Sequence, residues 1–353
     1  MATYFLTENN LTAFLEALCR DFDVYGTVER ESRLRYELLN ADNVKRVSVR
    51  PTRSYASPKS LLYPVSEKVA AYATSAGIAA EPVRSPERAI VGLRQCDLAA
   101  IRMFDRVMLE GEYIDTFYKS RRDATLLVST DCRDACPSCF CTMIEGQPYP
   151  KALYDLNLSP LAAGYLAETG SPKGEAVVEK NKLLFAAASD SQVAERDANR
   201  ASVTQKVIEQ NREFEPDAPI REVFVGEIDQ EKLQRLAFDC VECGACTNVC
   251  PSCYCFLTFE RLAAGAAAVE RGREWDSCQF AEYYRMAGAG GVKPNPKPFH
   301  RSRFVNRFYH KYWWFQEQFG QFQCSGCGRC FDACGGGIDP RRIIKEMSKK
   351  GKP

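Results

Sequence analysis

Eight of the seventeen cysteines in this chain form two runs with identical spacing. Each run reads C-x2-C-x2-C-x3-C, which is the spacing that bacterial ferredoxins use to hold [4Fe-4S] clusters. Three thiolates on one tight loop reach three iron corners of a cube, while the fourth, one helical turn onward, points elsewhere. The first run consists of Cys240, Cys243, Cys246 and Cys250, and the second of Cys324, Cys327, Cys330 and Cys334.

The two runs are predicted to exchange their fourth ligands, because each fourth cysteine of a two-cluster ferredoxin binds the partner cube. Site 1 is therefore Cys240, Cys243, Cys246 and Cys334, and site 2 is Cys324, Cys327, Cys330 and Cys250. Disulfides or zinc explain the pattern less well, since zinc sites usually combine two separated C-x2-C pairs. One departure is the run Gly335 to Gly337, which follows Cys334 where the motif normally has proline.

A second cysteine pattern occurs twice. Residues 136–141 read C-P-S-C-F-C and residues 250–255 read C-P-S-C-Y-C. The N-terminal copy and Cys132 follow an apolar, strand-like run at residues 126–128, and Cys96 follows another at residues 89–93. In a parallel sheet the loops after the carboxyl ends of strands gather at one edge, so these thiols are expected to meet there. They would hold either a third cluster or a zinc ion, or they would remain unligated or redox-active thiols.

Four other cysteines belong neither to the two ferredoxin runs nor to the N-terminal group. Cys19 lies close to the apolar face of a predicted helix and is interpreted as a buried structural thiol. Three more are weaker candidates, which either shape the surroundings of a ferredoxin cluster or join the N-terminal cysteines in an interdomain site; they are Cys253, Cys255 and Cys278.

The composition fits a folded protein of two or three domains, with 353 residues of which 45% are hydrophobic. No apolar run approaches the ~18 residues needed to span a bilayer, and the N-terminus lacks a signal-peptide pattern, so we expect a cytoplasmic protein without a transmembrane segment. The formal net charge is +1. Eight cluster thiolates would make the loaded protein slightly negative, so no nucleic-acid binding is expected.

The predicted fold class is α+β. Residues 1–156 form an N-terminal mixed α/β domain with a cysteine-rich edge, with helices near residues 11–18 and 98–109. Residues 157–231 form a polar extension and connection, interpreted as the outer part of the N-terminal domain and a link to the cluster domain. Residues 232–353 form a mostly helical, bacterial-ferredoxin-like domain for two [4Fe-4S] clusters. The two cysteine runs are 73 residues apart, so this domain carries a long insertion, residues 256–323.

Part of the insertion, about residues 301–318, has the pattern of an amphipathic helix. Aromatic side chains follow one face and basic side chains follow another. In one interpretation the aromatic face packs in the core and the basic face is solvated. In the other, the basic face docks an acidic redox partner. The predicted docking residues are Arg303, Arg307 and Lys311. After the last cysteine, Asp339 and Pro340 predict the start of a final helix.

Several of these segments together resemble a known family, the dicluster iron–sulfur subunits of anaerobic sulfite reductase and of soluble NiFe sulfhydrogenases. They are residues 92–97 (G-L-R-Q-C-D), 139–141, 250–255, 275–278 (W-D-S-C) and the last cysteine run. The resemblance covers most of the chain from about residue 50 onward. It implies a third cluster held by Cys96, Cys132, Cys139 and Cys141, with Cys136 as an alternative ligand.

The resemblance also implies an electron-relay subunit. Its partners would be a flavin-containing subunit linked to NAD(P)H or ferredoxin and a catalytic redox subunit of sulfite reductase, hydrogenase or heterodisulfide-reductase type. The residues favour a relay over an enzyme, because no nucleotide-binding glycine motif is present and only two histidines are available for acid–base chemistry. No bound nucleotide is expected. The alternative is a catalytic oxidoreductase acting on a small sulfur compound at an N-terminal cluster.

Overall fold

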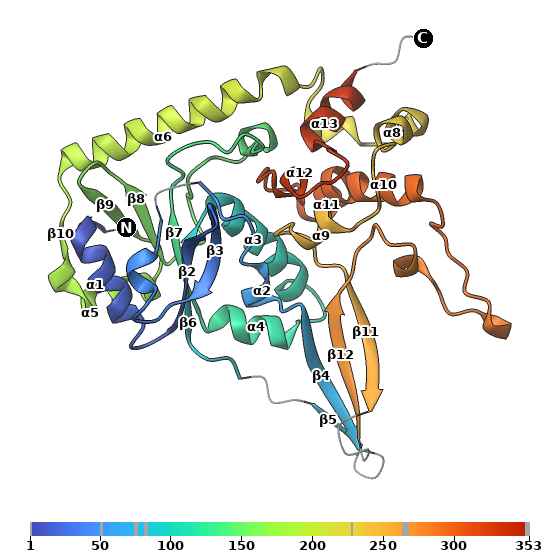
Figure 1. The fold of residues 1–353 in the computed structure, drawn as a ribbon, viewed down its shortest axis with the longest axis horizontal. Helices are drawn as coiled ribbons and strands as arrows, with labels where there is room; N and C mark the ends of the chain where they lie inside the picture. Colours follow the sequence, from blue (N-terminus) through green and yellow to red (C-terminus); the bar gives the residue numbers. More distant parts are fainter. Residues whose placement is uncertain are drawn as a thin grey trace.

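The computed structural model describes residues 2–49, 52–73, 77–80, 84–226, 229–262 and 268–349 (Figure 1). Its N-terminal half is built on an eight-stranded sheet with the order β10-β1-β9-β8-β7-β6-β2-β3. The strands are β1 (Thr3–Thr7), β2 (Asp23–Arg30), β3 (Arg33–Leu38), β6 (Arg88–Leu93), β7 (Thr125–Thr130), β8 (Leu156–Pro160), β9 (Gly164–Thr169) and β10 (Phe185–Ala187).

The centre of this sheet is parallel: β2 pairs with β6, β6 with β7, and β7 with β8. Every residue of β7 and β8 is buried, as expected for parallel strands covered on both faces. The helices of this half are α1 (Glu8–Leu18), α2 (Lys59–Leu62), α3 (Gln95–Leu109), α4 (Thr116–Asp123), α5 (Pro172–Lys180) and α6 (Asp190–Gln210). The predicted strands and the first two predicted helices are confirmed.

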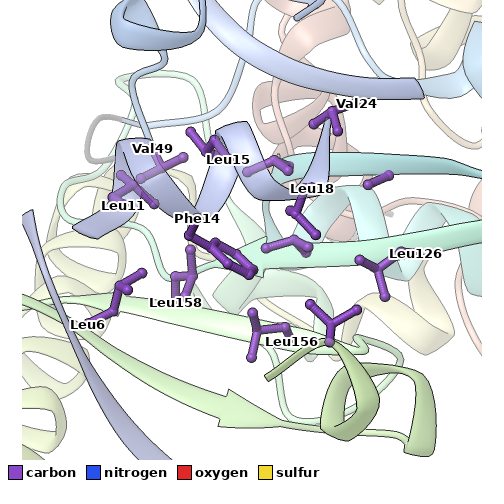
Figure 2. Close-up of a cluster of buried hydrophobic side chains, with 14 of the residues drawn as sticks. Leu6, Leu11, Phe14, Leu15, Leu18, Val24, Val49, Leu126, Leu156 and Leu158 are labelled. Atoms are coloured by element: carbon purple, nitrogen blue, oxygen red, sulfur yellow. The ribbon is translucent and has the colours of Figure 1, made fainter. Parts of the chain in front are cut away.

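Helix α1 covers one face of the sheet with its apolar stripe (Figure 2). Phe14 is fully buried and lies among Leu6, Leu156 and Leu158 of the strands beneath it. Burying a side chain of this size stabilises the fold by about 1.5–3 kcal/mol. Cys19 follows the helix and packs against this core, although it is only partly buried.

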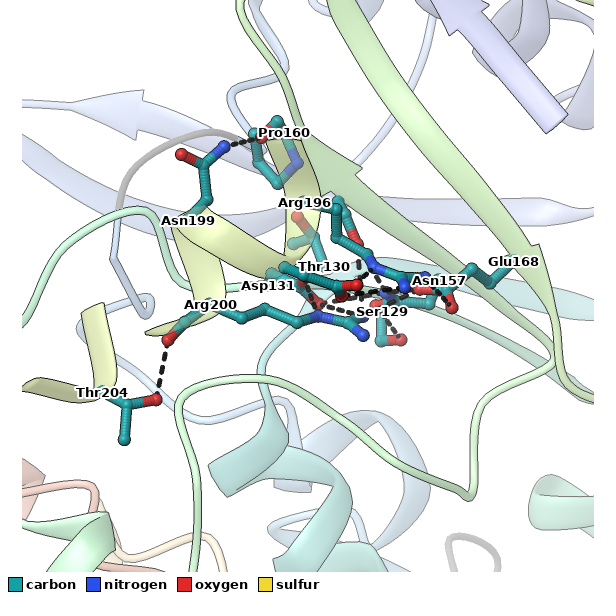
Figure 3. Close-up of polar contacts among 12 residues, drawn as sticks. Ser129, Thr130, Asp131, Asn157, Pro160, Glu168, Arg196, Asn199, Arg200 and Thr204 are labelled. Carbon is teal, nitrogen blue, oxygen red and sulfur yellow. Dashed lines mark hydrogen bonds and ion pairs between the residues drawn. The ribbon is translucent and has the colours of Figure 1, made fainter. Parts of the chain in front are cut away.

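Helix α6 lies across the sheet and is fixed by a polar network (Figure 3). Arg200 contacts Asp131 at 2.7 Å and Glu168 at 2.8 Å, and Arg196 contacts Glu168 at 2.7 Å. Asp131 also accepts a hydrogen bond from Asn157 of β8 at 3.0 Å. The network therefore holds the chain immediately before Cys132.

The N-terminal sheet continues beyond residue 156 into the polar segment 157–231. The strands β8, β9 and β10 all lie within the segment 157–231 or at its edge, and they pair in the same sheet as β1 and β7. The polar composition of this segment reflects the exposed faces of α5 and α6, which lie on the outside of the N-terminal domain.

The C-terminal half is less helical than predicted. Its helices are α7 (Ile220–Val223), α8 (Gln230–Leu236), α9 (Ala245–Asn248), α10 (His300–Tyr309), α11 (Phe315–Phe319), α12 (Arg329–Asp332) and α13 (Pro340–Ser348). The insertion contributes a hairpin, β11 (Phe256–Leu262) and β12 (Ala268–Trp275), which pairs with β4 (Ser66–Ala73) and β5 (Gly77–Ala80). This antiparallel sheet projects from the body of the molecule and joins the two halves (Figure 1).

The predicted amphipathic helix is confirmed as α10 and α11 joined by a π-helical turn at residues 310–314. Its aromatic stripe packs in a second core around Phe308 and Tyr312. Its basic stripe, however, is also buried, with exposed fractions of 2% for Arg303, 6% for Arg307 and 4% for Lys311. The prediction that these three residues dock a partner is therefore wrong, since a partner cannot reach them.

No helix in the described part of the chain has the length and hydropathy required to cross a membrane.

Candidate iron–sulfur centre

Site 1 is assembled from the loop before α9 and the turn after α12. The charge of the Cys240 thiol interacts with those of Cys246 and Cys334, so the first run and the last cysteine of the second run meet as the cross-ligation predicts. The backbone N–H of Ile338 also donates to the Cys334 sulfur at 3.3 Å. Cys243 is exposed to solvent.

The glycine run after Cys334 has a packing reason. A Cβ at Gly336 would overlap the backbone carbonyl of Asp239, so only glycine allows this turn to lie against the site 1 loop. Gly337 has a φ of +66°, which is a further position that favours glycine. The glycines therefore bring Cys334 to its partners in place of the usual proline.

Site 2 forms in the loop before α12. The Cys330 thiol interacts with those of Cys327, Cys324 and Cys250, so the last cysteine of the first run does cross to the second. Burial raises the pKa of the Cys330 thiol to about 12, and iron binding deprotonates a coordinating thiol outright. The pKa of Cys250 is lowered well below its usual range because Cys253 donates a hydrogen bond to it and Lys311 lies beside it.

Several donors surround the sulfurs of site 2. The Tyr312 hydroxyl donates to the Cys324 sulfur at 3.4 Å, and Gly326 N–H reaches the same sulfur at 3.5 Å. The Lys311 ammonium lies 3.4 Å from the Cys250 sulfur, and the Ser252 hydroxyl lies 3.3 Å from it. Hydrogen bonds of this kind favour the thiolate and help to tune a cluster's reduction potential.

The N-terminal cysteines meet at the predicted edge of the sheet. Cys96 lies in the first turn of α3 directly after β6, and Cys132 follows β7. With Cys136, Cys139 and Cys141 they line one cavity. Burial raises the pKa of Cys132 to about 12 and that of Cys139 to about 11. The structure thus brings together every cysteine predicted for a third cluster.

The N-terminal cavity adjoins site 2. Cys327 and Gly326 line it as well, and the charges of the Cys96 and Cys327 thiols interact. The Phe140 N–H donates to the Gly326 carbonyl at 2.7 Å, and a Cβ at Gly326 would lie 2.6 Å from the Cα of Cys141. The two cysteine loops are therefore in direct backbone contact.

The two similar hexapeptides lie against the same loop. In the first, a Cβ at Gly328 would lie 2.2 Å from the Ser138 carbonyl oxygen, so the two backbones are in close contact. In the second, the Ser252 hydroxyl donates to the Gln323 carbonyl at 2.8 Å, and the Gln323 side chain donates to the Ser252 carbonyl at 3.0 Å. The site 2 loop is thus held by both copies, a role that the repeated sequence alone did not indicate.

The C-terminal end of α6 holds the N-terminal cysteine loop from its other side. Gln210 donates to the carbonyls of Cys139 at 2.7 Å and Cys136 at 2.9 Å, and Asn211 donates to the Cys139 carbonyl at 2.9 Å. Neither residue was expected from the sequence, because nothing in a polar helix end identifies the loop that it contacts.

The three remaining candidates do not join the N-terminal cavity. Cys253 hydrogen-bonds with Cys250, so it lies beside site 2. Cys255 and Cys278 contact each other, and the Tyr283 hydroxyl reaches Cys255. The hydrogen bond from Cys278 lowers the pKa of Cys255 to about 6. Of the two roles considered from the sequence, the structure favours the one in which they shape the surroundings of a ferredoxin cluster.

Buried cations around the cysteines were also missed by the sequence analysis. Lys59 donates to the Cys253 carbonyl at 3.1 Å and lies 3.7 Å from the centre of the Trp275 ring. Arg53 bonds the Cys327 carbonyl and pairs with Asp332, while Arg329 lies 2.8 Å from Asp97. Arg53 and Arg329 are already paired with carboxylates, whereas Lys59 lies beside the thiols of Cys250 and Cys253 and suits an anionic group at site 2, since a buried charge is costly unless it is paired.

The all-thiolate ligand sets fit [4Fe-4S] clusters, and the cations beside them fit the negative charge of such clusters. Among the described residues, no group of three or more Cys, His, Asp or Glu side chains is arranged to hold a single metal ion. A chain with this donor chemistry is an iron–sulfur electron-transfer protein.

Comparison with known proteins identifies iron–sulfur domains and a relative that resemble this chain. Residues 239–338 match the 4Fe-4S dicluster domain family, and residues 205–253 match a second family of the same description. The chain is also 28% identical over 327 residues to sulfhydrogenase 2 subunit beta of Pyrococcus furiosus, and the alignment covers 92% of each chain. Residues 239–338 therefore form a 4Fe-4S dicluster domain, and the chain carries two [4Fe-4S] clusters.

Proposed function

We propose that this chain is the electron-relay subunit of a multisubunit, hydrogenase-like redox complex. It would pass single electrons between a flavin-containing subunit, linked to NAD(P)H or ferredoxin, and a catalytic redox subunit. The relative named above is a sulfhydrogenase subunit, which supports an assembly of this kind. A cube exchanges one electron at a time, so a series of cubes divides the two electrons of a reduced flavin into single steps.

The observation that carries the proposal is the order of the cysteine sets. Site 1 has an exposed cysteine, site 2 contains the buried Cys250 and Cys327, and Cys327 also lines the N-terminal cavity. We propose that the cavity holds a third [4Fe-4S] cluster on Cys96, Cys132, Cys139 and Cys141, with Cys136 as the alternative ligand. The three clusters would then form one path from the surface through both halves of the molecule.

The entry point of this path is proposed to be the surface around Cys243. Phe238 precedes the site 1 loop and Val241 lies within it, with exposed fractions of 87% and 67%. Large apolar side chains are common in the centres of protein interfaces. This surface replaces the basic stripe as the proposed docking site for a redox partner.

Iron and sulfide analysis tests the relay. The anaerobically reconstituted chain should contain about twelve irons and twelve acid-labile sulfides, four of each per cube. A variant with alanine at Cys132, Cys139 and Cys141 should contain about eight of each, whereas the matched Cys19→Ala variant should retain twelve. A wild-type content of eight that the triple variant leaves unchanged would remove the third cluster and shorten the path.

The same preparation separates the relay from the catalytic alternative. A relay subunit accepts electrons from an artificial donor but turns over no substrate without its partners. If the isolated chain with its full iron content reduced a small sulfur compound catalytically, the N-terminal site would be an active site and the relay proposal would fail.

A further inference from the structure

Two cations lie buried on one face of the helix formed by α10 and the following π-helical turn. Arg307 and Lys311 are four residues apart, so they project from the same side of the helix. This side points away from the aromatic core and toward the cysteines of both ferredoxin runs. The Lys311 ammonium lies 3.4 Å from the Cys250 sulfur, 3.3 Å from the Ser252 hydroxyl and 3.1 Å from the Gln323 carbonyl.

Arg307 occupies the space between the two sites. Its charge interacts with the thiol of Cys246 in site 1 and with those of Cys330 and Cys250 in site 2. Its buried Nε has no hydrogen-bond partner among the described residues. The Arg307 side chain is 6% exposed, so its charge is buried between the two cysteine runs. The guanidinium is thus placed to face anions that lie on both sides of it.

Arg303 provides an internal contrast. It belongs to the same basic stripe, but it pairs with the carboxylate of Glu242 and donates to the backbone carbonyl of Gln279 at 2.9 Å. Its charge is therefore balanced within the protein. The charges of Arg307 and Lys311 are balanced by cluster thiolates instead, which is the arrangement expected of residues that act on the clusters.

We propose that Arg307 and Lys311 set the reduction potentials of the two ferredoxin-type clusters, with Lys311 acting on site 2 and Arg307 acting on both sites. Reduction adds one negative charge to a cube, and a nearby buried cation stabilises the reduced form more than the oxidised form. The potential of a cube therefore rises with each such cation. This inference rests on the proposed function, because it specifies the direction of electron flow within the relay.

The contacts predict that site 2 has the higher potential. Site 2 receives the Lys311 charge, the Tyr312 hydroxyl and the Gly326 N–H, whereas Cys334 of site 1 accepts from the Ile338 N–H. Burial of site 2 works in the opposite direction, since it disfavours the more highly charged reduced cube. In our proposal the Lys311 charge, which contacts a ligand sulfur, raises the potential of site 2 more than burial lowers it. Electrons that arrive at site 1 therefore pass to site 2.

Redox titration followed by electron paramagnetic resonance tests the proposal on the reconstituted full chain. Lys311→Met should disfavour reduction of site 2 at least tenfold, which is a fall of about 59 mV for a one-electron couple, and should leave site 1 unchanged. Arg307→Met should lower both potentials. Tyr312→Phe, which removes one hydrogen bond without changing the charge, should lower site 2 by a smaller amount.

Two controls complete the experiment. Lys182→Met removes an exposed lysine that pairs with Glu179 far from the cysteines, and it should move neither potential. Cys324→Ser replaces one ligand of site 2 and thereby identifies which signal belongs to that site. If Lys311→Met fails to bind iron, two other variants carry the test. Lys311→Arg keeps the charge and should keep the wild-type order of the two potentials. Tyr312→Phe should still lower the potential of site 2.

The proposal is overturned if Lys311→Met shifts neither potential or shifts both equally, or if Tyr312→Phe leaves site 2 unchanged. Failure of the relay itself has a different signature. A wild-type chain that contains fewer than about eight irons contradicts the relay, whereas a fully loaded chain with unresponsive potentials contradicts only the role of these two cations.

Discussion

Asp97 joins the N-terminal sheet domain to the site 2 loop through a buried ion pair. Its Oδ1 lies 2.8 Å from Nη1 of Arg329, and the two side chains are 0% and 1% exposed. Asp97 stands in the first turn of α3, one residue after Cys96, while Arg329 lies between two cysteines of site 2. The pair therefore connects the two loops that would hold neighbouring clusters.

Asp97→Asn is expected to loosen this connection. The asparagine oxygen can still accept the hydrogen bond that Asp97 receives from the Arg94 N–H at 3.1 Å, so the helix start is kept and chiefly the charge is lost. Removing one partner of a buried pair costs about 3–5 kcal/mol. We take about 3 kcal/mol, because the thiols of Cys327 and Cys96 also interact with Arg329.

An anaerobic iron-release assay measures this cost. A loss of about 3 kcal/mol raises the population of the opened loop roughly 100-fold, since each 1.4 kcal/mol is a factor of ten. Iron transfer to an excess of chelator should accelerate by a similar factor when opening and closing are faster than capture. The loss of visible iron–sulfur absorbance with time gives the rate.

An exposed ion pair provides the matched control. Asp21 lies 2.6 Å from Lys180, and the two side chains are 36% and 64% exposed. Exposed pairs contribute about 0–1 kcal/mol, so Asp21→Asn should change the release rate less than about fivefold. If Asp97→Asn also changed it by less than fivefold, the buried pair would not hold the site 2 loop and the reasoning would be refuted.

Three further predictions concern the clusters and their surroundings. Cys250→Ala should abolish the site 2 signal and Cys334→Ala the site 1 signal in magnetic resonance spectra, because the runs cross; loss of the cluster adjacent in sequence would contradict the assignment. Gly328→Ala should reduce iron content sharply because its Cβ would overlap the Ser138 carbonyl, whereas Gly320→Ala, with a similar φ of +71° and nothing within 4 Å, should not. Phe238→Ser should slow electron exchange with the partner subunit while iron content stays at the wild-type level; an unchanged rate would place the docking surface elsewhere.

Regular spacing made much of the structure predictable from the sequence. The strands at β6 and β7 are continuous apolar runs, and the rule for parallel sheets placed Cys96 and Cys132 at one edge without any knowledge of their contacts. The final helix was marked by Asp339, which caps it by accepting from the Arg341 N–H at 2.9 Å. In each case the signal is local, so a single segment contains the information.

Pairing between distant segments was not predictable in the same way. The hairpin β11–β12 pairs with β4, about 200 residues earlier, and no short-range pattern encodes that partner. Likewise β8, β9 and β10 are short strands within a polar segment, and β10 has only three residues. β9 and β10 both pair with β1, which begins at Thr3, and β8 connects β9 to β7.

The basic stripe shows why periodicity alone cannot identify a surface. A period of 3.6 residues separates the faces of a helix, but it does not state what each face contacts. Here the aromatic face packs in the core around Phe308, and the basic face turns toward thiolates rather than water. The eight cysteines of the two ferredoxin runs could have indicated this burial, because their thiolates are internal anions that balance the charges of Arg307 and Lys311.

That balance links the fold of the C-terminal half to its cofactors. Buried cations without counter-charges destabilise a protein strongly, and the thiolates that face Arg307 and Lys311 are charged when iron is bound to them. The apolar core around α1 in the N-terminal half has no such dependence, because it consists of side chains such as Phe14 and Leu158. Cluster binding therefore contributes directly to the stability of the C-terminal half. The charges of Arg307 and Lys311, which make this half depend on the clusters, are also the charges that favour cluster reduction.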